Sequence, residues 1–366
     1  MKTLDLTNKT IVVVYMLYFG DMISLSPFLA VLRRAARGSR IILVTDERCR
    51  DAVSASPDVD EVIAADRRHM SMGDTWKLGR KIGGEKPDLL LVLHGTARTD
   101  LLSLAMHARC WAGEAGTWLG RRLIDLPLLV ERKDCHAAEK YVRVLGDLGV
   151  TDLCYDGMKV YAEEEWEAGA RSFYERARIG AGEKIAAFSV GSSTKEKNWP
   201  ASRYGKTADA MAERGFRPVF FGIKSELPLI DEALSVMKHR GEAVVAAGKL
   251  SMGEFIAAAG RASIAFTNDS GPMYVFDSRG VPTIAMFGPS NARLHHPMGR
   301  RSCALASTDM PMTQDHVAHT IRDGRYIPIE AIPLEEVLRA ASWALGERED
   351  EEYESHVHVV SQEKKR

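Results

Sequence analysis

The chain has 366 residues, of which 45% are hydrophobic and 27% are charged, and its 49 basic and 50 acidic residues give a formal net charge of -1. This length is more than one hydrophobic core usually fills, so we expect two domains of ordinary size. The composition excludes a disordered chain and a small disulfide-stapled module. The charge balance excludes a global positive field for nucleic acid, so any anion site must be local.

The cysteines stand singly, without the paired spacing of a structural zinc site. They are Cys49, Cys110, Cys135, Cys154 and Cys303. An odd, unclustered set is typical of a reducing compartment, and residues 1–7 lack the apolar core of a signal peptide, so we expect a cytoplasmic protein. The longest apolar runs, such as residues 11–17, are too short to cross a bilayer.

In the first half, apolar runs rich in Val and Ile alternate with segments of helical period, a pattern typical of parallel strands with crossover helices. The clearest unit is a strand at 11–17, a turn at 19–21 and a helix that opens at Ser26 and Pro27 and runs to Ala36. We also predict strands at 41–45, 62–65 and 88–93 and helices at 100–110 and 135–148. These elements predict one α/β domain over residues 1–178.

An acidic helix predicted at 161–179 ends at a glycine-rich turn, and the strand pattern restarts at 184–190, so we place the domain boundary at 178/179. Further strands are predicted at 217–222, 242–246, 262–266 and 282–287. They indicate a second doubly wound domain over 179–346, followed by a charged tail, 347–366, that should stay solvated. Ligands of such domains bind at the carboxyl ends of the strands.

Residues 190–200 follow a predicted strand and combine small residues, hydroxyls and lysines. Small residues allow close approach of the backbone, while hydroxyls and a lysine bind phosphoryl oxygens, so the loop suits a diphosphate. It lacks the Walker spacing, which argues against nucleotide hydrolysis. The alternative, a polar connector with solvated lysines, is the commoner role of such loops.

Two further motifs also end strands. In residues 267–274, Ser270 and Gly271 present backbone N–H groups at a predicted helix N-terminus, where the helix dipole favours an anion. Alternatively, Asp269 or Ser270 is only a helix cap. After the first strand, Asp21 could take a proton from an attacking hydroxyl, although a turn-forming Asp is the more ordinary interpretation.

Together with four other segments in the same order, these motifs resemble the ADP-heptose:lipopolysaccharide heptosyltransferases, glycosyltransferase family nine, over nearly the whole chain. The segments are 20–29 with the arginine pair that follows, 136–141, 194–200, 221–226, 250–251, 268–271 and 287–290. The resemblance implies a GT-B architecture, two Rossmann-like domains that face a central cleft. It also implies an inverting, metal-independent and cofactor-free transfer, with the donor in the second domain and a lipid-linked saccharide acceptor in the first.

The resemblance also implies roles for individual positions. Asp21 would be the general base and Lys197 the charge that assists the departing diphosphate. The implied donor-binding residues are Ser193, Thr194, Lys197, Glu226, which would meet the ribose, Asp269, Ser270, Gly271 and Tyr274. Trp199 completes the motif of the 194–200 loop, although packing is the more ordinary role of a tryptophan. ADP and heptose come from the resemblance alone.

Tyr274 departs from the family, which usually has a histidine at this position. A tyrosine donates a hydrogen bond but does not become cationic near neutral pH. Two alternatives therefore stay open: a GT-B-like sugar-nucleotide epimerase, which needs no acceptor, and a non-catalytic binding or scaffold protein.

For the acceptor, Gly20, Arg98 and Lys140 are the expected binding residues, the two cations being suited to a carboxylate or phosphate. Solvated surface placement of Arg98 and Lys140 is the alternative. A leucine-rich stretch, residues 101–130, contains two tryptophans and several arginines, which suits peripheral contact with a membrane; an ordinary core helix and loop is the alternative. Those residues are Arg109, Trp111, Trp118, Arg121 and Arg122.

Overall fold

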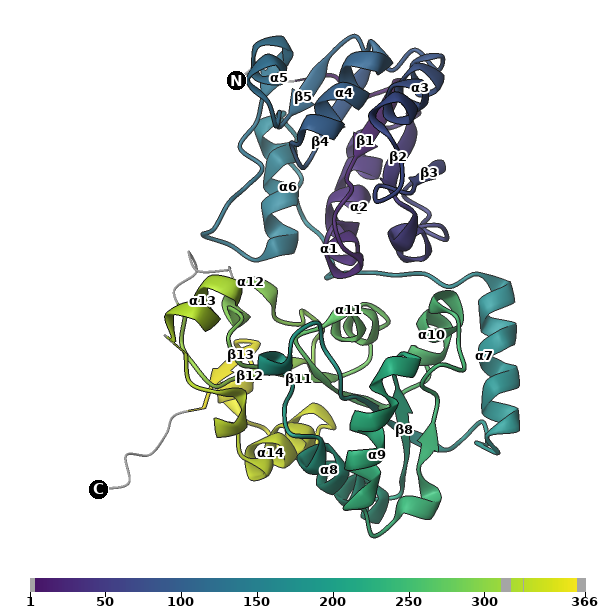
Figure 1. Cartoon of the computed structure of the whole chain (residues 1–366), viewed down its shortest axis with the longest axis vertical. Helices are drawn as coiled ribbons and strands as arrows, with labels where there is room; N and C mark the ends of the chain where they lie inside the picture. The colour runs from purple at the N-terminus through teal and green to yellow at the C-terminus, as the bar shows by residue number, and fades with distance from the viewer. Residues whose placement is uncertain (1–3, 311–316, 325, 361–366) are drawn as a thin grey trace. The chain divides into compact units, whose positions relative to one another are not determined.

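The computed structural model describes residues 4–310, 317–324 and 326–360, and the chain divides into two compact units (Figure 1). The first contains Met1–Arg132 and Ala137–Val160, and the second contains Lys133–His136 and Tyr161–Arg366. The division therefore falls earlier than the expected 178/179, because the intervening helix α7 (Glu164–Arg176) packs on the second unit. Its Tyr174 hydroxyl donates to the carbonyl of Ala258, at 2.8 Å.

In the first unit, six parallel strands form a sheet in the order β3-β2-β1-β4-β5-β6. The strands are β1 (Thr10–Val14), β2 (Arg40–Asp46), β3 (Glu61–Ala65), β4 (Leu89–Val92), β5 (Trp111–Gly113) and β6 (Leu126–Pro127). The four strands expected here are present. Strand β1 lies in the middle of the sheet and is buried on both faces, which is why its sequence is continuously apolar rather than alternating.

Two groups of helices cover the sheet of the first unit. They are α1 (Phe19–Ser24), α2 (Ser26–Ala35), α3 (Met72–Gly83), α4 (Ala97–Met106), α5 (Trp118–Leu123) and α6 (Ala137–Asp147). The chain moves from β1 to β2 in one direction across the sheet and from β3 to β4 in the other, so right-handed crossovers place α2 and α3 on opposite faces. Accordingly, α2 packs beside α6, and α3 packs beside α4 (Figure 1).

The second unit has a seven-stranded sheet in the order β13-β12-β11-β10-β7-β8-β9, again parallel throughout. The strands are β7 (Lys184–Ser189), β8 (Phe216–Phe221), β9 (Val244–Val245), β10 (Ile264–Asn268), β11 (Thr283–Phe287), β12 (Cys303–Ala306) and β13 (Val357–Val359). Stacked rings of Phe188, Phe220 and Phe266, from three neighbouring strands, form the centre of its core. All five strands expected in this half are present.

The helices of the second unit are α7, α8 (Ala201–Glu213), α9 (Leu227–Ser235), α10 (Met252–Ala259), α11 (Gly271–Ser278), α12 (Ala292–His295), α13 (Val317–Asp323) and α14 (Leu334–Ala344). Helix α8 packs beside α9 and α14, whereas α10 packs beside α7 and α11. Short 3-10 turns follow several strands, and those at Lys195–Lys197 and Lys224–Glu226 carry residues of the site described below.

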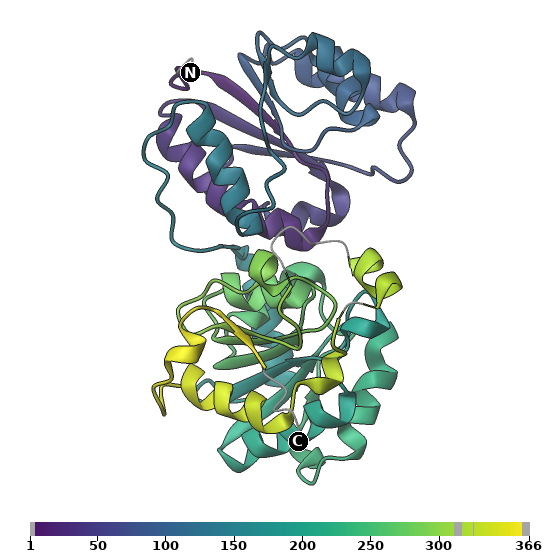
Figure 2. The same cartoon turned by 90° about the vertical axis from the view of Figure 1, so that its left-hand side faces the viewer.

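The C-terminal residues up to Val360 are part of the second unit rather than a separate tail, although most of their acidic side chains are exposed as expected. Strand β13 pairs with β12, and the yellow C-terminal segment lies against the second unit in both views (Figures 1 and 2). Tyr353 is fully buried against the Trp343 ring, and Arg339 binds the acidic side chains of Asp350 and Glu352. The acidic run is therefore held by an arginine of α14; residues 361–366 lie outside the described part of the chain.

Candidate functional site

Four loops singled out in the sequence follow β7, β8, β10 and β11. These strands are consecutive in the sheet and parallel, so the four loops lie at one edge, that of the carboxyl ends. The loops after β11 and β7 approach closely: a Cβ atom added at Gly288 would lie 3.1 Å from the carbonyl oxygen of Glu196. The topology thus gathers the motifs into one candidate site.

Asn268, at the end of β10, fixes both ends of the loop after β7. Its side chain is fully buried; Nδ2 donates to the carbonyl of Val190 at 2.9 Å, and Oδ1 accepts from the Trp199 backbone N–H at 2.9 Å. The Tyr204 hydroxyl also donates to Oδ1. This positioning role is missing from the sequence analysis. Trp199 is buried in the core, so its packing role is confirmed.

Lys197 and Asp269 form an ion pair at the centre of the site. Nζ of Lys197 lies 2.5 Å from Oδ2 of Asp269, and the two side chains are only 12% and 10% exposed. Burial by itself would raise the pKa of Asp269, but the charges of Lys197 and His295 and the hydrogen bond from Lys197 hold it below its ordinary value. The carboxylate therefore stays ionised, and the interpretation of Lys197 as a solvated connector lysine is wrong.

Ser270 precedes the N-terminus of α11 at the same site. It holds the cap position, but its side chain does not cap the helix; Oγ instead donates to the carbonyl of Asn268 at 3.3 Å. Gly271 and Pro272 open the helix. The alternative of a helix cap is therefore correct for the position of Ser270, although its side chain makes no capping hydrogen bond. The positive end of the helix dipole lies next to Asp269, the partner of Lys197.

The expected hydroxyls of the loop after β7 differ in their surroundings. Ser193 is exposed, whereas the Thr194 Oγ1 is buried without a hydrogen-bond partner among the described residues. The neighbouring Ser192 makes a hydrogen bond within the loop: its Oγ donates to the carbonyl of Thr194 at 2.7 Å. A buried hydroxyl without a partner is costly, which makes Thr194 a ready donor to a ligand.

Glu226 lies between the loops after β7 and β8. Its Oε2 accepts the Ile223 backbone N–H at 2.8 Å, and a methyl group added at Gly191 or Gly222 would overlap its carboxylate. Partial burial raises the pKa of Glu226, against the lowering effect of the Ile223 hydrogen bond. Glycine at both positions therefore makes room for the carboxylate at the carboxyl ends of two neighbouring strands.

Tyr274 is buried in the first turns of α11, and its hydroxyl oxygen lies 3.4 Å from Nδ1 of His295. His295 ends the short helix α12, after the loop that contains Gly288. The imidazole therefore lies beside Tyr274, at the position for which the resemblance implies a histidine. Sequence reasoning missed His295, since it stands outside every motif and only its position shortly after the 287–290 turn places it near the site.

In the first unit, the expected turn at Gly20 and Asp21 is the first turn of helix α1, after β1. The Asp21 Oδ2 accepts the Tyr18 backbone N–H at 3.3 Å. Burial raises the pKa of Tyr141 to about 12, opposed by Lys140 and assisted by the negative charge of Asp21. Asp21 therefore lies near the Tyr141 hydroxyl at the carboxyl edge of this sheet.

Both expected acceptor cations are held within the first unit rather than solvated. Lys140 pairs with Glu131 at 3.1 Å and lies over the Tyr141 ring. Arg98 donates to Thr75 Oγ1 at 2.7 Å and lines a cavity of about 340 Å³ together with Arg67 and His94. Burial is the main cause that lowers the pKa of His94, while neighbouring charges act in both directions.

The leucine-rich stretch separates into a buried and an exposed part. Trp111 is buried in β5 and does not support the expected membrane contact, whereas Arg109 is exposed and pairs with Asp88. By contrast, four large apolar side chains of α5 and the following loop are each exposed; these residues, Trp118, Leu119, Leu123 and Leu129, are here called the α5 patch. Trp118 is 67% exposed, with the Arg122 guanidinium 4.3 Å from its ring.

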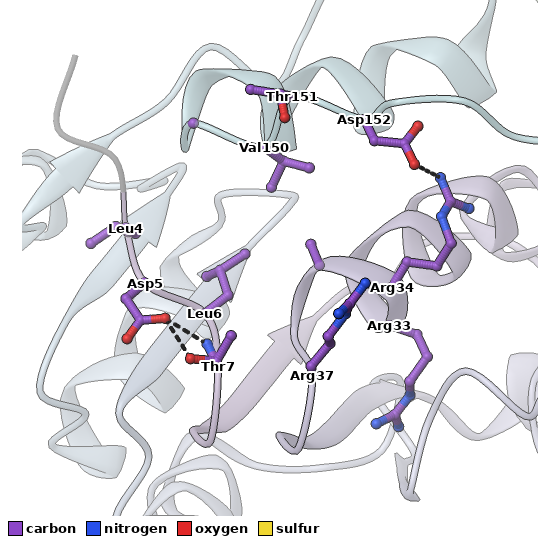
Figure 3. A pocket seen from close by; sticks show the side chains of 12 residues that line it. Leu4, Asp5, Leu6, Thr7, Arg33, Arg34, Arg37, Val150, Thr151 and Asp152 are labelled. Atoms are coloured by element: carbon purple, nitrogen blue, oxygen red, sulfur yellow. Dashed lines mark hydrogen bonds and ion pairs between the residues drawn. The ribbon is translucent and has the colours of Figure 1, made fainter.

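A cavity of about 850 Å³ lies at the opposite, amino-terminal edge of the first sheet (Figure 3). It is lined by residues that precede β1 and by the ends of α2 and α6. Two of the arginines that line the cavity form ion pairs within the protein, Arg33 with Asp60 and Arg34 with Asp152. The cavity therefore lies at the edge of the sheet opposite to the carboxyl ends of the strands, where ligands of such domains bind.

The described residues contain neither a metal-binding cluster nor a membrane-spanning helix. No group of three or more His, Cys, Asp or Glu side chains in residues 4–310, 317–324 and 326–360 is arranged to hold a metal ion. Across the same ranges, no helix is both long and apolar enough to span a membrane.

Comparison with known sequences matches residues 75–323 to the profile described as glycosyltransferase family 9 (heptosyltransferase). Lipooligosaccharide heptosyltransferase 2 of Haemophilus influenzae is 24% identical over 301 residues, which cover 79% of this chain and 86% of that protein. Lipopolysaccharide heptosyltransferase 2 of Escherichia coli is 25% identical over 304 residues, which cover 78% of this chain and 84% of that protein.

Solved structures agree with these matches. A glycosyl transferase family 9 structure from Veillonella parvula is 34% identical, with a TM-score of 0.89, and the match covers 95% of this chain and all of that one. The ADP-heptose lipopolysaccharide heptosyltransferase II of Escherichia coli has a TM-score of 0.74 at 18% identity, over 92% of this chain and 99% of that one. The predicted fold class, two Rossmann-like domains of GT-B type, is confirmed.

Proposed function

Because this chain belongs to glycosyltransferase family 9, the heptosyltransferase family, we propose that it transfers heptose or a related sugar from an ADP-sugar to an acceptor of the lipopolysaccharide inner-core type. Family membership makes the chain a glycosyltransferase; the donor, the acceptor and the stereochemistry are the proposal. The observation that carries it is the ion pair of Lys197 and Asp269 beside the N-terminus of α11.

This pair suits a departing diphosphate. As the bond to the sugar breaks, negative charge develops on the diphosphate, and groups that are already in place stabilise that charge without reorganising. Asp269 holds the ammonium of Lys197, which has three N–H donors and therefore keeps donors for a phosphoryl oxygen. Thr194 and the backbone N–H groups of Ser270 and Gly271 would hold the remaining oxygens, with exposed Ser193 at the rim.

Glu226 is the proposed partner of the nucleotide ribose. Its carboxylate lies against Gly191 and Gly222, at the strand ends where a Rossmann-like domain binds a nucleoside. A carboxylate accepts hydrogen bonds from two vicinal hydroxyls, which is the chemistry that a ribose presents.

Asp21 is the proposed general base, and Gly20, Arg98 and Lys140 are the proposed acceptor-binding residues. In an inverting transfer, the acceptor hydroxyl attacks the anomeric carbon on the face opposite to the diphosphate, and its proton passes to the base as the bond forms. Asp21 lies at the carboxyl end of β1, as this role requires of a residue of the first domain. Arg98 and His94 line a cavity at the same sheet edge and suit an anionic group of the acceptor.

We further propose that the transfer needs no metal ion and that the lipid acceptor is met at a membrane surface, on the cytoplasmic side. Lys197 and the N-terminus of α11 supply the positive charge that a metal supplies elsewhere. The α5 patch combines an exposed tryptophan and leucines with Arg121 and Arg122, a composition that suits the interface of an anionic bilayer. Undiminished turnover in excess EDTA is the expected result.

The first test is a thermal-shift panel with ADP, UDP, GDP, CDP and ADP-heptose. A ligand at one hundred times its dissociation constant stabilises the native state by about 2.7 kcal/mol. Selective stabilisation by ADP and ADP-heptose is expected; a response to UDP alone would replace the proposed donor, and no response to any of the five would favour a scaffold protein. An epimerase would convert the nucleotide sugar with no acceptor present.

A further inference from the structure

The imidazole of His295 lies beside the proposed diphosphate site. Its Nδ1 is 3.4 Å from the Tyr274 hydroxyl oxygen, and its charge acts on the Asp269 carboxylate. Asp269 and Tyr274 are buried, whereas His295 is half-buried on α12. Three elements therefore converge here: α12, α11 and the loop after β10, whose Asp269 pairs with Lys197 of the loop after β7.

We propose that His295 is a donor-binding residue whose imidazole contacts the diphosphate of the nucleotide sugar and, when protonated, adds a second positive charge beside Lys197. The proposal rests on the proposed function, because the anion is the diphosphate placed at this site. The Tyr274 hydroxyl oxygen lies 3.4 Å from Nδ1, which places the ring on the side of the site that holds Asp269 and Lys197.

The division of labour follows from the chemistry of the two side chains. The Tyr274 phenol donates or accepts a hydrogen bond but carries no positive charge near neutral pH, whereas an imidazole takes up a proton in that range. A hydrogen bond that joins two charged partners is about twice as strong as a neutral one. The site thus obtains a cationic imidazole from α12, while the α11 position supplies the hydroxyl that orients it.

Several described groups near His295 bear on how binding should depend on pH. Asp269 attracts the protonated ring, and Lys197 lies on the other side of that carboxylate. His136 and His296 also lie near the ring, whose charge contributes to lowering the pKa of both. Burial lowers the pKa of His296 to about 4 and that of His136 well below its ordinary value, so both stay neutral across the range in which imidazoles usually titrate.

The experiment is titration calorimetry of ADP with the full chain at about pH 5.5 and about pH 8.5, limits that bracket ordinary imidazole titration. The proteins are the wild type, H295Q, H295K and the control H239Q, whose histidine is half-buried beside Glu242, outside the proposed site. At each pH the variant is compared with the wild type, because the ionisation of ADP itself then affects both alike. Thermal melting of each variant checks that it is folded.

We expect H295Q to bind ADP about tenfold more weakly than the wild type at the lower pH, and about equally at the higher pH, as the loss of a charge-assisted hydrogen bond predicts. H295K should bind ADP tightly at both pH values, because the charge of a lysine does not titrate in this range. H239Q should bind ADP with the same affinity as the wild type at each pH. A purely structural role for His295 would not produce this pattern. Equal binding by H295Q and the wild type at both pH values would overturn the proposal and leave the ADP donor standing.

Inorganic pyrophosphate separates the two proposals if ADP binds to none of the proteins. Pyrophosphate binding that weakens in H295Q at low pH would support the His295 contact and overturn ADP as the donor nucleotide. Failure of both ADP and pyrophosphate to bind would overturn both proposals.

Discussion

The ammonium nitrogen of Lys197 lies 2.5 Å from a carboxylate oxygen of Asp269, and both side chains are almost entirely buried. Lys197 comes from the loop after β7 and Asp269 from the loop after β10, strands that are neighbours in the sheet. A buried ion pair is weak evidence for stability, because the cost of desolvating two charges offsets their attraction. Its place at a helix N-terminus gives this pair a functional interpretation.

K197M should reduce turnover by at least about a hundredfold, the usual effect of removing one group that stabilises developing charge. It should also destabilise the fold by about 3 kcal/mol, because the buried Asp269 carboxylate loses its partner. The double variant K197M/D269N separates the two effects: urea unfolding should show most of the stability recovered while turnover stays low. Recovery of turnover together with stability would contradict the catalytic role.

D21N should lower turnover by about a hundredfold or more while leaving ADP binding unchanged, since a general base acts on the acceptor proton in the transition state. Steady-state kinetics and calorimetry on the same preparation make the comparison. Full activity of D21N would exclude Asp21 as the base, and weakened ADP binding would show that the substitution disturbs more than the acceptor side.

G191A should weaken ADP binding, because the added methyl group displaces the Glu226 carboxylate. G182A is the matched control, since a Cβ there meets nothing within 4 Å. If displacement of Glu226 is the cause, calorimetry should give G191A/E226A the same affinity as E226A alone, because the two substitutions remove one interaction. Additive losses would indicate that Gly191 contacts the ligand independently.

The free energy of unfolding should fall as the pH is lowered below the ordinary imidazole range. Burial is the main cause that lowers the folded-state pKa of His296, to about 4, and that of His136 also. The unfolded chain, with imidazoles near about 6.5, therefore binds more protons between these values, at about 1.4 kcal/mol per pH unit for each proton. Urea unfolding should show a shallower dependence for H296N than for the wild type and H239N; parallel curves would contradict the assignment.

Substitution of the α5 patch by W118S/L123S should reduce sedimentation with anionic vesicles several-fold, because both side chains are exposed and apolar. V236S changes an exposed apolar residue of the second unit and should sediment like the wild type. Failure of the wild type to sediment with the vesicles at low salt would remove the membrane contact from the proposal. An equal reduction in sedimentation for W118S/L123S and V236S would show that the vesicle binding is not specific to the α5 patch.

Long, continuously apolar strands such as β1 and β7 were predictable, since burial on both faces leaves a clear pattern. The strands that went unpredicted are short: β5, β6, β12 and β13 have two to four residues each, too few to establish a pattern. The acidic run after Gly346 was expected to be a solvated tail. Its contacts with Arg339 of α14 depend on tertiary packing, which the local sequence pattern does not show.

In the site, sequence reasoning identified the loops but not the contacts between them. The pairing of Lys197 with Asp269 joins residues far apart in the chain, and Asn268 binds two ends of another loop. His295 belongs to no motif, and only the packing of α12 near Tyr274 reveals it. Such relationships depend on tertiary packing, which periodicity and spacing do not encode.

The most direct test of the account is mass spectrometry of products formed from ADP-heptose by the wild type and K197M, with and without a lipopolysaccharide-core acceptor. We predict one added heptose on the acceptor, with release of ADP, for the wild type, very little for K197M, and no altered sugar nucleotide when the acceptor is absent. Conversion of ADP-heptose without the acceptor, or no transfer by the wild type, would contradict the proposed function.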